Sequence, residues 1–443
     1  MSRSKRKPLP TTPIAVSIQS LTHDGRGVAH VDGKATFIDE ALPGEDVEFI
    51  YTEIRKDYAE GKVVKVLKAA PIRTQAPCPH YGVCGGCSFQ HVESSAQIEV
   101  KQNLLLEQFK RIGKVEIPEL WEPLIGPHWG YRSKARMGVK YVAKKERVLV
   151  GFRERRNPFL AEIGNCMVMN PKVGLKLIAL GEMISELTIR DKIPQIEVAI
   201  GDTDCVLAVR VLEPPTDADK AIMADFAKQH EITLCLQSKG PDTIKPLNSE
   251  DSMMLTYSLP DHDIEFKFRP AMFTQVNYDI NRQMINRVLA TLDLNENDTV
   301  LDLFCGLGNF TLPIAKYAGK VVGIEGDQPL VNHAKENARH NNINNAEFYA
   351  ADLSKDLDAH PWAQQKYNKI MLDPSRAGAS DVLPYFKKWQ PELIVYVSCN
   401  PSTLARDAGI LVNDMGYVLV KAGVMDMFPQ TAHVESMAVF RKA

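Results

Sequence analysis

The 443-residue sequence predicts a multidomain α/β protein that ends in a Rossmann-like, doubly wound sheet. Strand-like and helix-like segments alternate from residue 299 onwards, as in a parallel sheet with crossover helices. The last two strand segments, Val418–Val424 and Val434–Phe440, follow each other without a helix, so they predict a terminal antiparallel hairpin. The length suits two or three domains. With 44% hydrophobic and 24% charged residues, the composition argues against a disordered chain, and no apolar run is long enough to span a membrane.

The N-terminal part is predicted to contain a short tail and a small barrel. Residues 1–11 form a basic tail, and because no apolar segment follows, the tail is not a secretory signal and we expect a cytoplasmic protein. Residues 12–70 contain short strand segments separated by turn signals such as Asp24-Gly25-Arg26-Gly27, which predicts an OB-like β-barrel. Small barrels with basic loops often bind RNA, although a purely structural module has the same pattern.

The central part, residues 71–269, is predicted to be rich in β-strands. Ala135–Phe152 and Gln195–Val211 alternate like antiparallel strands, and Ala96–Ile112 has the apolar spacing of a helix. Between residues 131 and 156, ten Lys and Arg stand against two Glu, a local excess of +8 in a chain whose formal charge is −2. Such a patch suits a phosphate backbone, and the alternative is a solvated strand face.

Four of the eight cysteines predict a metal site. They are Cys78, Cys84, Cys87 and Cys166. The first three lie within ten residues in a loop whose glycines let it wrap around an ion or cluster, and the fourth is the best-placed partner. Three close thiols with a distant fourth are typical of an iron–sulfur cluster, whereas four cysteines, or His80 and His91 with some of them, also suit zinc. The spacing alone leaves both metals open.

A glycine turn and three carboxylates predict the cofactor. The strand Thr299–Phe304 leads into Cys305-Gly306-Leu307-Gly308-Asn309 and a helix, which lets the backbone approach a nucleotide closely. Thr311 stands where the pyrophosphate fingerprint needs a third glycine, which disfavours NAD. Three successive strands end in Glu325, Asp352 and Asp373. Each alone could be a helix N-cap, but together they favour S-adenosylmethionine, because its sulfonium is positively charged.

Cys399 and Glu435 are the candidate nucleophile and base. Cys399 follows the strand Leu393–Ser398 and precedes a helix, whose N-terminus is expected to lower the pKa of the thiol. Taken singly, Cys399 suits a small buried side chain and Glu435 a solvated strand carboxylate. Together they suit methylation at carbon 5 of uracil. Attack of a thiolate at carbon 6 makes carbon 5 nucleophilic, and a base must later remove the carbon 5 proton.

Four motifs resemble those of the RNA uracil-C5 methyltransferases. They are Asp302-Leu303-Phe304-Cys305-Gly306-Leu307-Gly308-Asn309-Phe310, Leu372-Asp373-Pro374-Ser375-Arg376-Ala377-Gly378, Val397-Ser398-Cys399-Asn400-Pro401 and His433-Val434-Glu435-Ser436. The resemblance covers nearly the whole chain, is greatest to the enzymes of 23S ribosomal RNA, and includes a barrel similar to a TRAM domain. It implies an RNA-binding barrel over 12–70, an iron–sulfur domain over 71–269 and an S-adenosylmethionine-dependent methyltransferase domain over 270–443. It also implies that the helix near 96–112 packs on the methyltransferase domain.

The resemblance assigns a role to each candidate residue. Cys399 matches the nucleophile, and Glu435 matches the base that removes the carbon 5 proton. Cofactor contacts are matched by Gln275, Phe304, Asn309, Glu325, Asp352 and Asp373. The ligands of a [4Fe-4S] cluster are matched by Cys78, Cys84, Cys87 and Cys166, which favours iron–sulfur over zinc.

The implied reaction converts one uracil of 23S ribosomal RNA to 5-methyluridine. The same chemistry on a different uracil, in a dual-site ribosomal or a transfer-RNA enzyme, is the alternative. Two other classes are an iron–sulfur oxidoreductase that uses a nicotinamide, and a non-catalytic RNA-binding protein in which Cys399→Ala leaves function intact. We expect ribosomal RNA as the partner, and neither DNA, a membrane nor an obligate protein partner.

Overall fold

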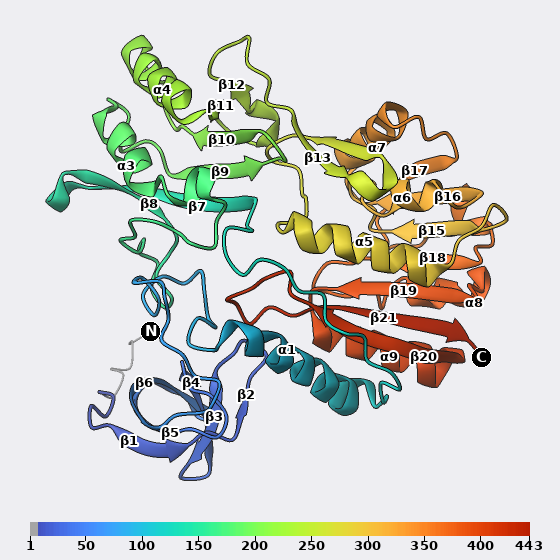
Figure 1. The fold of residues 1–443 in the computed structure, drawn as a ribbon, viewed down its shortest axis with the longest axis horizontal. Helices are drawn as coiled ribbons and strands as arrows, with labels where there is room; N and C mark the ends of the chain where they lie inside the picture. The colour runs from blue at the N-terminus through green and yellow to red at the C-terminus, as the bar shows by residue number, and fades with distance from the viewer. Residues whose placement is uncertain (1–7) are drawn as a thin grey trace, which may run out of the picture.

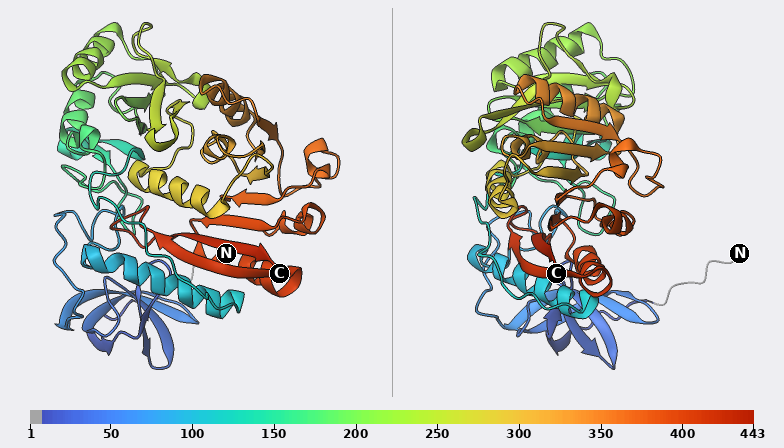
Figure 2. Two further views of the ribbon diagram at one scale, coloured as in Figure 1. Left: turned by 45° about the vertical axis from the view of Figure 1, so that its right-hand side comes forward. Right: turned by 90° about the vertical axis from the view of Figure 1, so that its right-hand side faces the viewer.

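The computed structural model describes residues 8–443. These residues form four β-sheets (Figure 1). The predicted basic tail, residues 1–11, lies mostly outside the described residues. The largest parts are an N-terminal barrel, a central sheet and a C-terminal sheet, and the long helix α1 lies between the barrel and the C-terminal sheet (Figures 1 and 2). Among the described residues, no helix combines the length and apolar character needed to cross a membrane.

Six strands curl into the predicted barrel. They are β1 (Ile14–Ser17), β2 (Ser20–Leu21), β3 (Gly27–Val31), β4 (Lys34–Asp39), β5 (Asp46–Ile54) and β6 (Tyr58–Lys68). Their order is β1-β5-β6-β4-β3-β2, and only β4 and β6 pair in parallel. Val47 and Phe49 of β5 point into the barrel core. Gly61 leaves room for the Phe49 ring, because a Cβ at this position would lie 2.3 Å from it.

Helix α1 (Ser94–Gln108) continues into a π-helical turn at Phe109–Gly113, close to the predicted helix Ala96–Ile112. It precedes the central sheet in sequence but packs on the C-terminal part, against α9 (Pro401–Met415) and β20 (Tyr417–Met425). A glycine at residue 113 permits the close approach, since a Cβ there would lie 2.5 Å from the carbonyl oxygen of Ala405. In space, α1 therefore belongs to the C-terminal part.

The central sheet has the strand order β12-β11-β10-β9-β7-β8. Its strands are β7 (Lys134–Val142), β8 (Arg147–Gly151), β9 (Gln195–Ile200), β10 (Cys205–Arg210), β11 (Thr233–Gln237) and β12 (Lys245–Pro246). Only β10 and β11 are parallel, and α4 (Asp217–His230) connects them. Together with α3 (Leu177–Glu186), α4 covers one face of the sheet. A capping box of Thr216 and Asp219 fixes the start of α4.

The C-terminal sheet is the predicted doubly wound sheet, with the order β17-β16-β15-β18-β19-β21-β20. Its strands are β15 (Thr299–Leu303), β16 (Lys320–Glu325), β17 (Ala346–Ala350), β18 (Lys369–Leu372), β19 (Leu393–Ser398), β20 and β21 (Glu435–Lys442). The first five strands are parallel, and β21 is antiparallel to both β19 and β20. The predicted terminal hairpin is confirmed, and its last strand is inserted between β19 and the edge strand β20.

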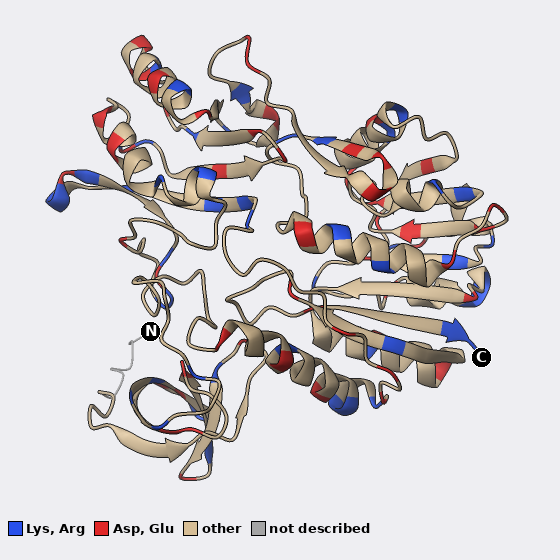
Figure 3. Cartoon of the chain, in the orientation of Figure 1, with Lys and Arg blue, Asp and Glu red and all other residues tan. Residues whose placement is uncertain are grey.

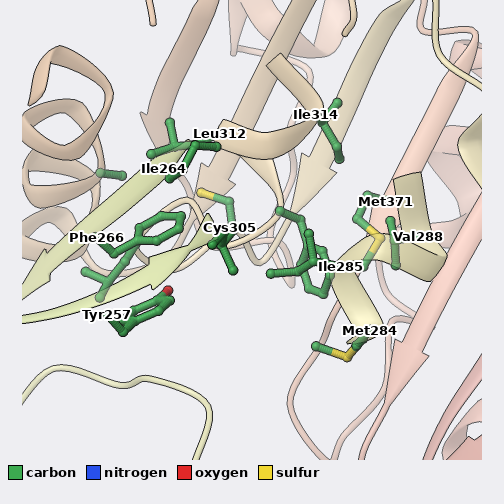
Figure 4. Close-up of a cluster of buried hydrophobic side chains, with 14 of the residues drawn as sticks. Tyr257, Ile264, Phe266, Met284, Ile285, Val288, Cys305, Leu312, Ile314 and Met371 are labelled. Atoms are coloured by element: carbon green, nitrogen blue, oxygen red, sulfur yellow. The ribbon is translucent and has the colours of Figure 1, made fainter. Parts of the chain in front are cut away.

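Helices cover both faces of this sheet. They are α5 (Tyr278–Leu292), α6 (Thr311–Ala315), α7 (Gln328–His340), α8 (Phe386–Trp389) and α9, while the short α2 (Pro171–Gly174) belongs to the central part. On one face, the hairpin of β13 (Leu255–Leu259) and β14 (Ile264–Phe268) adds Tyr257 and Phe266 to a core with Met284 and Ile285 of α5 (Figure 4). Cys305 is buried in the same core, where it serves as a small apolar side chain.

Candidate active site

The carboxyl ends of five parallel strands meet at one edge of the C-terminal sheet. Asp352 follows β17, Glu325 ends β16, Phe304 follows β15, Asp373 follows β18 and Cys399 follows β19. Because β21 runs the other way, its first residue, Glu435, lies at the same edge. The chain crosses from one side of β15 to the other between β17 and β18, so the boundary of β15 and β18 is the switch point where such sheets bind ligands.

Strand pairing brings Cys399 and Glu435 together. Ser398 of β19 is paired with Ser436 of β21, whose hydroxyl donates to the Ser398 carbonyl oxygen at 3.2 Å. Cys399 directly follows Ser398, and Glu435 directly precedes Ser436, so both candidate residues lie at the carboxyl end of β19. Asn400 caps α9 by accepting a hydrogen bond from the backbone N–H of Ser402 at 3.1 Å, so Cys399 stands at the junction of a strand and a helix.

The expectation that the helix N-terminus lowers the pKa of the Cys399 thiol is wrong. Burial raises this pKa to about 11, and the neighbouring carboxyls of Glu435 and Asp373 raise it further, against a smaller lowering by Arg376. Desolvation and nearby negative charge both disfavour a thiolate. Burial and the neighbouring carboxyls therefore favour the thiol form of Cys399.

Two buried carboxyls, Glu435 and Asp302, and a half-buried one, Asp373, surround the switch point. Glu435 is 3% exposed, and its burial together with the nearby Asp373 holds its pKa well above the usual range. Burial raises the pKa of Asp373 to about 7. Asp302 in β15 is fully buried, and its pKa is also raised to about 7, mainly by burial. Asp302 was not among the predicted site residues, although a single acid within an apolar strand could have identified it as one.

Asp373→Asn is expected to stabilise the ligand-free protein at neutral pH. The folded-state pKa of Asp373 lies near 7, above its usual 3.8, so ionisation disfavours the folded state as the pH rises from about 4 towards 7 and beyond. An amide carries no such penalty. Melting curves at pH 5 and pH 8 should show the variant gaining a few degrees over wild type at pH 8 and much less at pH 5. An equal gain at both values would contradict the assigned charge effect.

The glycine turn after β15 is bent by left-handed residues. Phe304 has a φ of 66°, which is costly for an aromatic residue, and Gly306 and Gly308 have φ values of 55° and 90°. The backbone N–H of Gly306 donates to Glu325 Oε2 at 3.1 Å, so the turn is tied to the end of the next strand. This arrangement holds Phe304 and Glu325 side by side at the sheet edge.

The other predicted cofactor residues are held in different ways. Gln275 Nε2 donates to Asp373 Oδ2 at 3.4 Å, which brings these two together. Asn309 Oδ1 accepts from the Tyr257 hydroxyl at 2.9 Å and from Asn281 Nδ2 at 3.1 Å, so this side chain ties the turn to β13 and α5. Asp352 is exposed on the far strand β17, and its hydrogen bonds from Ser354 lower its pKa.

A cleft of about 610 Å³ opens in front of Cys399, where three parts of the chain meet. The C-terminal part contributes Arg376, Cys399 and His433. The central part contributes Gly85, Cys87 and Ser88 from residues 78–89, which we call the cysteine loop. The barrel contributes the turn His23–Arg26 with Asp39, Glu40 and Glu60, and the central part contributes Arg155 and Arg156. A substrate in this cleft would contact the barrel and the sheet edge at once.

The four predicted cysteine ligands line a second cavity, of about 460 Å³, that shares Arg376 and His433 with the cleft. The cysteine loop is braced by protein contacts: the Tyr81 hydroxyl donates to the Ser88 carbonyl oxygen at 2.7 Å, and Arg155 donates to the Cys87 carbonyl oxygen at 2.7 Å. Within residues 8–443, no three His, Cys, Asp or Glu side chains converge on a single-ion position.

Each of the two histidines considered for zinc has a protein partner at one ring nitrogen. His91 is buried, its Nδ1 lies 2.6 Å from the Tyr81 hydroxyl, and burial lowers its pKa to about 3. His80 Nε2 accepts a hydrogen bond from the backbone N–H of Gly164 at 3.2 Å. His91 Nε2 is buried without a hydrogen-bond partner, so these contacts leave the zinc alternative open.

The basic patch is less available than its charge suggests (Figure 3). Five of its ten cations form ion pairs within the chain, namely Arg136 with Glu197, Lys145 and Arg147 with Glu162, Arg155 with Glu40, and Arg156 with Asp39. Lys134 is largely buried, donates to the Met272 carbonyl oxygen, and has its pKa lowered to about 8 by burial. The last two pairs join the central part to the barrel, whereas Arg136, Lys145 and Arg147 remain exposed.

Comparisons with known proteins agree with this arrangement. A family model described as tRNA (Uracil-5-)-methyltransferase matches residues 216–443, and a TRAM domain model matches residues 12–64. The 23S rRNA (uracil(1939)-C(5))-methyltransferase RlmD of Methylococcus capsulatus is 53% identical over 440 residues, which cover 99% of each chain. The RlmD of Alkalilimnicola ehrlichii is 48% identical over 442 residues, covering 100% of this chain and 99% of the relative.

A solved structure has the same fold over nearly the whole chain. It is the Pyrococcus abyssi tRNA (uracil-54, C5)-methyltransferase in complex with S-adenosyl-L-homocysteine, with a TM-score of 0.72 and 23% identity. The match covers 96% of this chain and 100% of that one. At this identity the likeness concerns the fold, whereas the family model and the relatives extend to the sequence motifs. On these grounds the chain belongs to the tRNA (uracil-5-)-methyltransferase family, the RNA uracil-C5 methyltransferases, and carries a TRAM domain at its N-terminus.

Proposed function

We propose that this protein methylates carbon 5 of a uracil in 23S ribosomal RNA, with S-adenosylmethionine as the methyl donor. The observation that carries the proposal is the pairing of β19 with β21, which brings a cysteine and a buried glutamate to one sheet edge beside the glycine turn. The two relatives described above are named for uracil 1939, and we propose the same nucleotide. A ribosomal RNA substrate places the reaction in the cytoplasm.

Cys399 and Glu435 would act in succession. The Cys399 thiol first loses its proton to solvent. The resulting thiolate forms a bond to carbon 6 of the uracil, and the displaced electron pair makes carbon 5 nucleophilic. Carbon 5 gains the methyl group, after which the Glu435 carboxylate takes the carbon 5 proton. The electron pair of that C–H bond re-forms the double bond between carbons 5 and 6 as the bond from Sγ to carbon 6 breaks. The net change replaces one proton with a methyl group and restores the thiolate.

Six residues are proposed to hold the cofactor. They are Gln275, Phe304, Asn309, Glu325, Asp352 and Asp373. The site fits a cationic ligand, because Asp302 Oδ1 is buried without a hydrogen-bond partner and lies close enough to Asp373 and Glu325 for their charges to affect it. When bound, S-adenosylmethionine supplies the methyl group and a positive sulfonium that favours ionised carboxyls. Glu325, whose oxygens accept from the N–H groups of Gly306 and Gly326, is the proposed ribose ligand.

The cleft between the barrel and the sheet edge is the proposed RNA site. Its size suits one nucleotide outside the base stack, the form in which carbon 6 is exposed to Cys399. Arg26, on a tight turn of the barrel, lines the cleft and lies over the Phe37 ring at 5.1 Å from its centroid. The barrel and the sheet edge would thus hold the same segment of RNA.

Tritium release tests the proposed function. Unmodified 23S ribosomal RNA labelled at carbon 5 of uridine would be mixed with the protein, with and without S-adenosylmethionine, and with transfer RNA in parallel. Release from ribosomal RNA that needs the cofactor supports the reaction, the atom and the substrate class together. Release from transfer RNA alone would move the protein to that substrate, and no release from either would overturn the proposal.

We also propose that Cys78, Cys84, Cys87 and Cys166 hold a [4Fe-4S] cluster. Their four thiols line one cavity, and three of them lie within ten residues of the chain with a distant fourth. This spacing suits a cluster, in which each thiolate binds a different iron. Such a cluster would supply a rigid cross-link between the cysteine loop and residue 166 of the central part. Because all four irons of such a cluster would have protein ligands, a structural role is favoured over one in catalysis.

Cys87→Ser is expected to lose the cluster. After anaerobic reconstitution with iron and sulfide, wild type should contain about four irons per chain and the variant less than about one. Cys205→Ala is the matched control, because Cys205 is buried in the central core and is not one of the four. Stoichiometric zinc in the wild-type protein, with no iron taken up, would contradict the cluster.

A further inference from the structure

Residues 426–434, which we call the hairpin loop, connect β20 to β21 and end directly before Glu435. Unlike an ordinary surface turn, the loop has buried polar residues: Asp426 and Gln430 are each 1% exposed. His433 of the same loop lines the cleft beside Cys399. The position of the proposed base therefore depends on the strand pairing of β21 on one side and on the hairpin loop on the other.

Helix α1 holds the start of the hairpin loop through a buried cation. Lys101 Nζ donates to Asp426 Oδ1 at 2.7 Å and to the Phe428 carbonyl oxygen at 2.9 Å. Lys101 is 0% exposed. A buried ion pair is weak evidence for a gain in stability, because desolvation of the two charges offsets their attraction. The contact is better explained by its geometry, which fixes a main-chain carbonyl of the loop as well as a side chain.

A second residue of α1 holds the middle of the loop. The backbone N–H of Gln430 donates to Gln97 Oε1 at 2.8 Å, and Gln97 Nε2 donates to Gln430 Oε1 at 2.9 Å. Gln430 has a φ of 68°, a conformation that costs about 1–3 kcal/mol and persists only where the surroundings impose it. The paired amides supply that constraint.

The cysteine loop and the barrel both contact the hairpin loop. The backbone N–H groups of Ser88 and Phe89 both donate to the Gln430 carbonyl oxygen at 3.0 Å, and the Ala432 N–H donates to Ser88 Oγ at 2.8 Å. Gly25 of the barrel approaches so closely that a Cβ there would lie 2.9 Å from the Ala432 Cβ. Three parts of the chain therefore converge on the segment that precedes Glu435.

We propose that Lys101 and Gln97 are positioning residues for the removal of the carbon 5 proton by Glu435. The inference rests on the proposed function. Cys399 is carried by β19 and α9, whereas Glu435 follows the hairpin loop, so release of the loop from α1 displaces the base without displacing the nucleophile. Thiolate addition then proceeds, but proton removal and release of the RNA slow down. The covalent intermediate accumulates as a result.

The test uses the full-length protein, unmodified 23S ribosomal RNA and S-adenosylmethionine. Lys101→Met is expected to lower turnover about 10- to 100-fold, the range that a displacement of about 1 Å can produce. It should also raise the fraction of protein bound covalently to RNA several-fold on denaturing gels, with the rate of adduct formation within about twofold of wild type. Lys110→Met, the same change at an exposed lysine in the turn after α1, is the matched control and should behave as wild type.

A double variant separates positioning from stability. Lys101→Met leaves Asp426 as an unpaired buried charge, whereas Lys101→Met with Asp426→Leu removes both charges and should recover the melting temperature. We expect the adduct to persist in the double variant, because the Phe428 carbonyl is still released. If turnover returns together with stability, or if adduct and turnover fall in parallel, the inference is wrong.

Two further outcomes have a defined meaning. If Lys101→Met does not fold, adduct and turnover are measured instead in the double variant and in Gln97→Met. Gln97→Met removes the paired amides without leaving a buried charge. If Glu435→Gln itself forms no adduct while wild type releases tritium, the role of the base, and this inference with it, is overturned. Absence of tritium release from wild type would instead point to failure of the proposed function.

Discussion

Cys399→Ala is expected to abolish methylation of 23S ribosomal RNA, with a loss of at least about 10⁴-fold in turnover, a size typical of a removed nucleophile. No other thiol of the described residues follows β19 or stands beside Glu435 at the sheet edge, so none can replace it at carbon 6. The variant should also form no covalent complex with RNA. Methyl incorporation from labelled S-adenosylmethionine, together with denaturing gels, measures both effects.

The variant should keep its fold and its RNA affinity. Cys399 is only partly buried, and its backbone position is set by β19 and by the cap of α9, which alanine leaves in place. Melting temperature and RNA binding are therefore expected to stay close to wild type. Methylation by Cys399→Ala within about tenfold of wild type would show that carbon 5 is activated without a thiolate, and would favour an RNA-binding protein in which Cys399 has a structural role.

Glu435→Gln is expected to trap the covalent RNA complex. Thiolate addition and methyl transfer do not need the carboxylate, but the carbon 5 proton then has no acceptor, and the bond from Sγ to carbon 6 cannot break. Turnover should fall about 10²- to 10⁴-fold, the usual contribution of a positioned base. Denaturing gels should show a shifted protein band that requires both RNA and S-adenosylmethionine.

Glu392→Gln is the matched control for this substitution. Glu392 lies just before β19, at the end of the strand opposite Cys399, and is exposed. The same chemical change there should leave turnover and adduct at wild-type levels. Loss of both adduct and turnover in Glu435→Gln would assign Glu435 to an earlier step, such as formation of the thiolate.

The sequence alone was sufficient to predict the strands that carry the site. Apolar runs that end in a carboxylate or a cysteine identified the carboxyl ends of β16, β18 and β19, because parallel strands bring those ends to one edge. The lack of a helix before Glu435 predicted an antiparallel final strand. That reversal is what places a residue at the start of a strand next to residues at the ends of others.

Contacts between distant segments were beyond what local patterns could predict. Lys101 looks like any polar residue of a helix, yet it is buried against a residue 325 positions away. The charge of the basic patch was similarly counted from one stretch of sequence, without the acids of the barrel that pair with Arg155 and Arg156. The pKa of Cys399 was misjudged for the same reason, since the burial that raises it most, and the carboxyls of Glu435 and Asp373 that raise it further, come from packing between distant segments.

The long separation between Lys101 and Asp426 also governs how the protein can fold during synthesis. At about 5–20 residues per second, a ribosome adds the intervening 325 residues in roughly 16–65 s. Throughout that interval α1 has emerged without the strands and the helix on which it packs, so its apolar and polar contacts must remain hydrated or be covered by chaperones. A nascent chain that ends before residue 426 lacks the ion pair altogether. Emergence of the hairpin loop is therefore the event that completes these contacts, and Glu435, the proposed base, follows directly after it.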